Sequence, residues 1–256
     1  MALPCRSVIS LLASSALVIL LLGRVVYRAS FQAFSGKKRI LIPSCLLLLL
    51  IGWFVGAYLL AKEEFFVRMS GIFLPNIGLL FIPLLIGIIA LSSSVTLRIL
   101  VTHLSQPGLI CVQITRVLGA AFLLLYAQGL MPGAFAFPAG IGDIIVGVTA
   151  PIVAYLLFRK KPYSRALAIC WNILGFVELV LAIFLGFFTS PTPYQFLALQ
   201  QPNTLLFAFP LALVPAFAVP LSLLLHIFSL KVLMKNTWSG KNNKKSQSQQ
   251  SCGVFN

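Results

Sequence analysis

Seven long runs of apolar residues restrict what this chain can fold into. A helix that crosses a membrane needs about 20 predominantly apolar residues. Only 9% of the 256 residues are charged, whereas a soluble domain carries about a quarter, so a soluble globular protein is excluded. The runs predict an all-α, polytopic membrane bundle of about seven transmembrane helices, at residues 8–22, 40–61, 71–91, 109–130, 134–158, 166–188 and 205–230.

The distribution of the basic residues predicts how the bundle is oriented. There are 19 Lys and Arg against four acids, and short loops on the inner side of a membrane carry an excess of Lys and Arg. With the N-terminus outside, the inner loops and the tail hold 15 basic residues and the outer segments hold three. We therefore expect an outside N-terminus and an inside C-terminus. The clear bias fits a bacterial inner (plasma) membrane.

The first apolar run is expected to be a retained helix. Five basic residues follow it and only Arg6 precedes it, which favours an outside N-terminus. No small-residue cleavage motif ends the run, in contrast to a signal peptide. Residues 1–230 then form one transmembrane domain, and residues 231–256 form a basic polar tail that is expected to be disordered, because it cannot bury a core.

The positive charge predicts a lipid environment and no nucleic-acid partner, because the basic residues stand in short loops between apolar runs. The lysines of the tail either contact anionic lipid head groups or only mark the inner side, and the second interpretation is the simpler one.

Three ionisable residues inside the predicted spans are the strongest functional signal. Arg116, Asp143 and Glu178 fall in the fourth, fifth and sixth runs, where a charge costs about 2.5–3.5 kcal/mol on insertion scales. At about 1.5 Å per residue, the two acids lie roughly 14–15 Å below the outer edge and Arg116 about 10 Å above the inner edge. Because the long arginine side chain reaches toward either acid, we expect the three groups to meet near the midplane.

The residues around these three groups predict close helix packing. Gly140, Asp143 and Gly147 share one face of the fifth run, and Gly175 shares a face with Glu178, with Asn172 near it. Small residues let neighbouring helices approach closely. One arginine neutralises one carboxylate, so the other acid is protonated, hydrated or paired elsewhere, and it is a candidate proton carrier.

Two classes of function follow from this cluster. The first is a small-solute or proton-coupled transporter in which Arg116, Asp143, Glu178 and Asn172 form the substrate or proton pathway, since ionisable residues inside a membrane usually mark such pathways. The alternative is a non-enzymatic assembly or scaffold protein, whose buried charges only fix the register of the helices. A membrane-embedded enzyme is less favoured, because His, Asp and Glu are scarce.

One motif points toward an enzyme. The sequence Gly140-Ile141-Gly142-Asp143 resembles the G-x-G-D motif of the intramembrane aspartyl proteases. That resemblance implies a second aspartate that shares a proton with the first, and Asp143 is the only aspartate of the chain. Short motifs of this kind often occur by accident, so the motif is not interpreted as evidence of proteolysis.

No cofactor or metal site is expected. Retinal needs a lysine within a span, and none of the predicted spans contains an internal one. Haem in a bundle needs paired axial histidines. The two histidines, His103 and His226, are both predicted near the inner side and are interpreted as interfacial residues with a buried body and a wet tip.

Overall fold

The computed structural model describes residues 5–67 and 81–234, and within these ranges it is helical, with no strand. The N-terminal part consists of two long helices, α1 (Cys5–Ala33) and α2 (Lys38–Lys62), followed by α3 (Ile82–Ser93) and α4 (Val95–His103). The next span comprises α5 (Gln106–Val112), a 3₁₀ segment η2 (Gln113–Gly119) and α6 (Ala120–Ala127). It is followed by α7 (Gly133–Phe158), α8 (Ser164–Thr189) and a C-terminal helix, Val214–Met234, which begins with a π-helical turn, η3 (Val214–Ala218).

Six of the described helices are long and apolar enough to cross a membrane, and the α3–α4 pair counts as a seventh if it is one broken span. Many apolar side chains face outward, among them Leu20, Leu49 and Phe158, each at least 70% exposed. Water would not favour such a surface, whereas lipid covers it without cost. The protein is thus an all-helical membrane protein.

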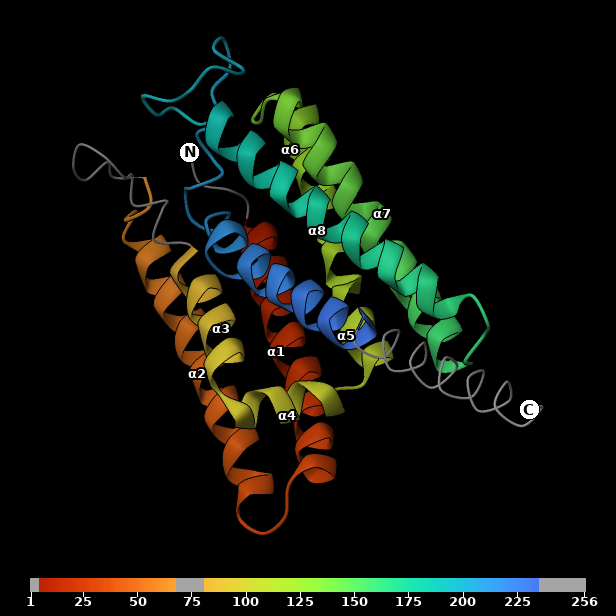
Figure 1. Ribbon diagram of the computed structural model, residues 1–256. Coiled ribbons are helices and arrows are strands. Elements are labelled where there is room, and N and C mark those ends of the chain that lie inside the picture. Colours follow the sequence, from red (N-terminus) through yellow and green to blue (C-terminus); the bar gives the residue numbers. More distant parts are fainter. Residues whose placement is uncertain (1–4, 68–80, 235–256) are drawn as a thin grey trace, which may run out of the picture.

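The C-terminal helix occupies the centre of the bundle (Figure 1). In this view it passes in front of α1, with α2 and α3 on one side and the tilted pair α7–α8 on the other. Its contacts reach both sides, because Leu224 packs against Gly87 of α3 and His226 packs against Gly175 of α8. This helix therefore links the two halves of the molecule.

In the C-terminal helix, a tryptophan side chain replaces a backbone hydrogen bond that a proline cannot make. Pro220 has no N–H to donate to the carbonyl group of Ala216, four residues earlier. The indole Nε1 of Trp53, on α2, donates to that carbonyl oxygen at 3.0 Å, and its ring packs edge-on against Phe217 with the centroids 5.1 Å apart. This contact ties α2 to the start of the C-terminal helix.

Helix α4 turns sharply away from α3 and crosses α1, and both α1 and α2 continue beyond it (Figure 1). The two helices are bent by 96° at Ser94, whose backbone is extended and whose hydroxyl group accepts a hydrogen bond from the N–H of Leu97. A serine cap of this kind starts a new helix. The same device recurs at Ser105, which caps α5 through the N–H of Gly108.

The predicted spans agree with the helices to different degrees. The runs 40–61, 109–130, 134–158 and 166–188 match helical spans to within three residues at each end. The first ten residues of the run 71–91 lie outside the described residues, and the rest falls almost entirely in α3. The tail predicted from residue 231 is still helical to Met234, while residues 235–256 lie outside the described part.

The first and last predicted spans have wrong boundaries. Helix α1 continues 11 residues beyond the predicted end at residue 22. Gly23 does not interrupt it, and no proline follows before Gly36, which adopts φ +59° in the next turn. The last span begins at Val214 instead of residue 205. Pro210 accounts for this shift, since proline removes a backbone donor and disfavours a helical conformation at the residue before it.

Candidate functional site

Arg116 lies in the 3₁₀ segment that interrupts the α5–α6 span. A 3₁₀ stretch within a longer helix often marks a hinge or a strained site. The side chain of Arg116 is only 5% exposed, although a guanidinium group stays charged in proteins. A buried, permanent charge of this kind needs partners.

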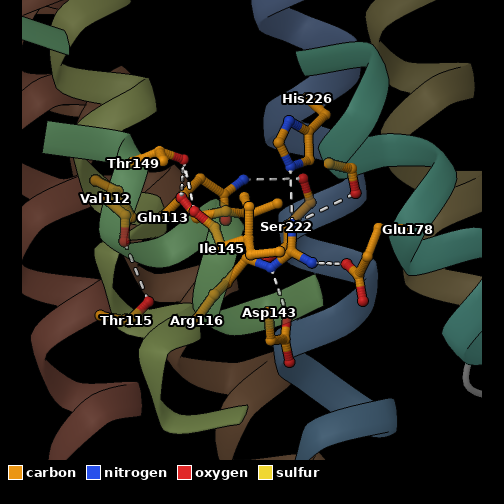
Figure 2. Close-up of polar contacts among 12 residues, drawn as sticks. Val112, Gln113, Thr115, Arg116, Asp143, Ile145, Thr149, Glu178, Ser222 and His226 are labelled. Carbon is orange, nitrogen blue, oxygen red and sulfur yellow. Dashed lines mark hydrogen bonds and ion pairs between the residues drawn. The ribbon is translucent and has the colours of Figure 1, made fainter. Parts of the chain in front are cut away.

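The structure brings Arg116 together with both of the acids found inside the predicted spans (Figure 2). Its Nε atom donates to Oδ1 of Asp143 on α7 at 2.6 Å, and its Nη2 atom forms an ion pair with Oε2 of Glu178 on α8. The two carboxyl side chains are 16% and 11% exposed. One guanidinium group thus joins three transmembrane elements.

A second branch of the cluster starts from the remaining nitrogen of the same guanidinium group. The Nη1 atom of Arg116 lies 3.3 Å from Nε2 of His226 and donates to the carbonyl oxygen of Gly175 at 3.4 Å. Nδ1 of His226 lies 3.0 Å from Oδ1 of Asn172, and Nδ2 of Asn172 donates to the carbonyl oxygen of Ala168 at 2.7 Å. Asn172, which the sequence placed only near the polar face, thus reaches Arg116 through the histidine. The five side chains that these contacts join form the ionic cluster: Arg116, Asp143, Asn172, Glu178 and His226.

These contacts determine the tautomer of His226. Arginine has donors only, so Nε2 of His226 must be unprotonated to accept from Arg116. The proton is then on Nδ1, which donates to the amide oxygen of Asn172. His226 is therefore assigned as a neutral imidazole, and Arg116 supplies the single positive charge of the cluster.

The sequence-based interpretation of His226 as an interfacial residue is wrong. Its side chain is fully buried and packs against the ring of Trp171, with the centroids 5.4 Å apart. The error follows from the span boundaries: a helix over Val214–Met234 places His226 near its middle, whereas the predicted run 205–230 placed it close to the inner end. Pro210 could have indicated the later start of this helix, whereas nothing in the hydropathy indicated that it continues to Met234. His103, by contrast, is exposed.

Glycines make room for the polar side chains of the cluster. A methyl group added at Gly119 would lie 2.6 Å from Oδ2 of Asp143, and one at Gly175 would lie 2.7 Å from Nε2 of His226. Real Cβ atoms essentially never come this close to other atoms. The same relationship holds for Gly142, where an added methyl group would lie 2.9 Å from Oε1 of Glu178. The G-x-G-D sequence is therefore part of this close packing.

The charges of the cluster do not balance. With both carboxyl groups ionised and His226 neutral, Arg116, Asp143 and Glu178 carry a formal charge of −1. Oε1 of Glu178 is buried and has no hydrogen-bond partner among the described residues. A buried carboxyl oxygen without a partner is unfavourable. A bound proton or a second cation would complete the cluster.

Two cavities meet at Asp143. The smaller has a volume of about 80 Å³ and is lined by Arg116, Asp143, the amide of Gln113 and the hydroxyl residues Ser14, Ser15, Thr115 and Ser222, besides apolar groups. The larger has a volume of about 230 Å³ and apolar walls contributed by α6, α7, α8 and the segment from Leu206 to Val219. Asp143 lines both cavities, whereas Arg116 lines only the smaller one.

Among the described residues, no group of three or more His, Cys, Asp or Glu side chains is arranged to hold a metal ion. The side chains of the cluster form ion pairs and hydrogen bonds, and its carboxyl and imidazole groups are of the kind that exchange protons. Its members come from η2, α7, α8 and the C-terminal helix.

The apolar helices and the buried ionic cluster define the chain as a polytopic helical membrane protein. Residues 72–234 match the model of the family described as Domain of unknown function (DUF8737). Since this match covers more than half of the chain, the protein belongs to that family. All five side chains of the cluster lie in the matched region, whereas α1 and α2 precede it. No curated protein and no solved structure matches the chain.

Proposed function

We propose that the protein is a small-solute transporter coupled to protons, with Arg116, Asp143, Glu178 and Asn172 in the substrate or proton pathway. The unequal charge of the cluster carries this proposal. Two carboxyl groups share a single arginine, so one of them can gain or lose a proton while the other remains paired. Acidic residues paired within a membrane commonly serve as proton relays.

The position of the cluster between two cavities supports transport rather than a purely structural role. Asp143 lines both cavities, one with several polar groups and one apolar. Two irregular helical segments flank this region, namely the 3₁₀ turn that carries Arg116 and the π-helical turn η3. Transport sites are typically framed by interrupted helices, because their weaker backbone bonding allows local rearrangement.

The arrangement in the membrane belongs to the same proposal. Seven crossings, with the run 71–91 predicted from the sequence as the third, an outside N-terminus and an inside C-terminus agree with the distribution of the basic residues. The membrane proposed is the bacterial inner membrane, and the lipid bilayer is the expected partner, with anionic head groups near the lysine-rich tail. Impermeant maleimide labelling of intact cells tests the orientation. In a cysteine-free background, Tyr194→Cys should react, and Lys161→Cys should react only after lysis; the opposite pattern would reverse the orientation.

A flux assay in proteoliposomes tests the function. The lumen contains pyranine, a pH-sensitive dye, and a panel of amines, carboxylates and sugars is added outside. We expect at least one solute to produce a proton flux that depends on external pH and is lost in Asp143→Asn and Glu178→Gln. Glu63→Gln, which removes an exposed carboxylate outside the cluster, is the matched control and should behave like the wild type. Full, pH-dependent flux in both cluster variants would refute the proposal.

A scaffold or assembly role is the second candidate, and one observation favours it. The contacts of Arg116 extend through His226 and Asn172 to a backbone carbonyl group, so the cluster links four elements as a purely structural network would. This role predicts that the charged groups affect folding and nothing else.

A further inference from the structure

The larger cavity combines aromatic walls with a single ionisable group. Of the 17 described residues that line it, seven are phenylalanines and one, Asp143, is ionisable. Phe122, Phe135 and Phe207 are buried and form part of the inner wall. An apolar pocket with one convergent polar group is the usual form of a small-molecule site.

The charge presented to this cavity is negative. Arg116 and Glu178 do not line it, so Asp143 is the ionisable group that the described residues present to this cavity. Arg116 engages Oδ1 of Asp143 through Nε, and no hydrogen bond to Oδ2 is found among the described residues. Together with the formal charge of −1 on the cluster, this placement favours a cation over an anion or a neutral solute.

The walls suit a cation with an apolar body. The faces of aromatic rings attract cations, by about 2 kcal/mol or more where water is excluded. A volume of about 230 Å³ exceeds that of an apolar protein cavity of about 150 Å³ that binds benzene. The cavity thus has room for one aromatic ring, or an aliphatic group of similar size, with a small cationic head.

The outer wall of the cavity reaches the surface of the bundle. Phe184, on α8, lines the cavity and is 54% exposed, and the neighbouring Phe187 is partly exposed. Part of the cavity wall thus lies at the apolar surface of the bundle, where the apolar body of a solute would meet lipid.

We propose that the larger cavity binds a small lipophilic organic cation, with its cationic head beside Asp143 and its apolar body against the phenylalanine rings. This inference names the class of solute, so its physiological meaning rests on the proposed transport function. Binding itself is measurable without transport, which keeps the two separable.

Equilibrium dialysis of the full-length protein in detergent, with radiolabelled phenyltrimethylammonium as the probe, tests this inference. We expect saturable binding above that of empty micelles. Benzenesulfonate, an anion of similar size, should not compete, and tetramethylammonium, which lacks the apolar body, should compete weakly. Absence of saturable binding, or equal competition by benzenesulfonate, would overturn the inference.

Two carboxyl variants separate a local contact from a general effect of charge. Asp143→Asn and Glu178→Gln each remove one acid from the same arginine, yet only Asp143 lines the cavity. We expect Asp143→Asn to weaken binding by about tenfold or more, equivalent to about 1.4 kcal/mol, and Glu178→Gln to weaken it less. Equal losses in both variants would contradict a head group placed beside Asp143.

A third variant fills the cavity and leaves the charges unchanged. Ala182→Phe adds a ring to the wall and should abolish binding, even if Asp143→Asn fails to fold; undiminished binding would place the probe elsewhere. Size-exclusion profiles verify folding. Binding of the probe without any proton flux would refute the proposed transport function and leave the cation site standing. Proton flux with another solute, together with no binding of the probe, would refute the cation site and leave transport standing.

Discussion

The Nη1 atom of Arg116 lies 3.3 Å from the Nε2 atom of His226, across 110 residues of sequence. This contact joins the 3₁₀ segment of one span to the middle of the central helix. It makes a neutral histidine part of the support of a buried charge, because the imidazole accepts from arginine and donates to Asn172. The geometry of the cluster depends on both of these roles.

Replacement of this histidine by an apolar residue should destabilise the fold. His226→Phe removes one acceptor and one donor and leaves Arg116 and Asn172 with unsatisfied buried groups, each of which costs about 1–3 kcal/mol. We expect a lower midpoint of thermal unfolding in detergent. His103→Phe changes an exposed histidine and should alter stability by no more than about 0.5 kcal/mol. Equal midpoints for the two variants would contradict the assigned network.

Much of the fold could be predicted from the sequence, because apolar runs of membrane length report helices directly. The 134–158 and 166–188 runs correspond closely to α7 and α8. The convergence expected for Arg116, Asp143 and Glu178 also follows from a simple argument, since charges in an apolar medium need partners. Their assembly around one guanidinium group agrees with that argument.

Features that depend on backbone geometry could not be read from hydropathy. The irregular segment before Val214 is apolar in sequence, so composition alone makes it look like part of a continuous span. The predicted run 71–91 ends before Ser94, and hydropathy does not contain the 96° angle between α3 and α4. Because the last helix begins later than predicted, His226 was placed near the inner end of the span instead of near its middle. The cavities depend on how several helices pack together, and the spacing of residues in one helix does not contain that information.

The glycine opposite Asp143 should tolerate no side chain. Gly119→Ala would place a methyl group 2.6 Å from Oδ2 of Asp143, so the carboxyl group or α7 must shift. Overpacking of this kind typically costs about 1–3 kcal/mol. Gly56→Ala is the control, because nothing lies within 4 Å of its added methyl group, and helix propensity predicts a gain of up to about 1 kcal/mol. Chemical denaturation in detergent checks both signs, and a stabilising Gly119→Ala would contradict the packing described.

Replacement of all three charged residues of the cluster should destabilise the fold less than replacement of Arg116 alone. Arg116→Met leaves two carboxyl groups without their cation, and breaking a buried pair in this way costs about 3–5 kcal/mol. The triple variant Arg116→Met, Asp143→Leu, Glu178→Met leaves no unpaired charge and should unfold at a higher temperature than the single variant. If the triple variant folds, a transporter loses proton flux, whereas a scaffold retains its role. A triple variant less stable than Arg116→Met would mean that the groups stabilise the fold beyond their mutual pairing.

The hydrogen bond from Trp53 to the carbonyl group of Ala216 should contribute less to stability when Pro220 is replaced. Trp53→Phe removes the indole donor and should cost about 1 kcal/mol, the usual net value of one hydrogen bond. Pro220→Ala supplies a backbone N–H that can donate to the same oxygen, so the cost of Trp53→Phe should fall in that background. Trp171→Phe removes an indole donor to Thr149. It should lower the free energy of unfolding by the same amount whether residue 220 is proline or alanine. A double-mutant cycle by chemical denaturation measures these values, and strict additivity of Trp53→Phe and Pro220→Ala would show that the indole does not replace the missing backbone donor.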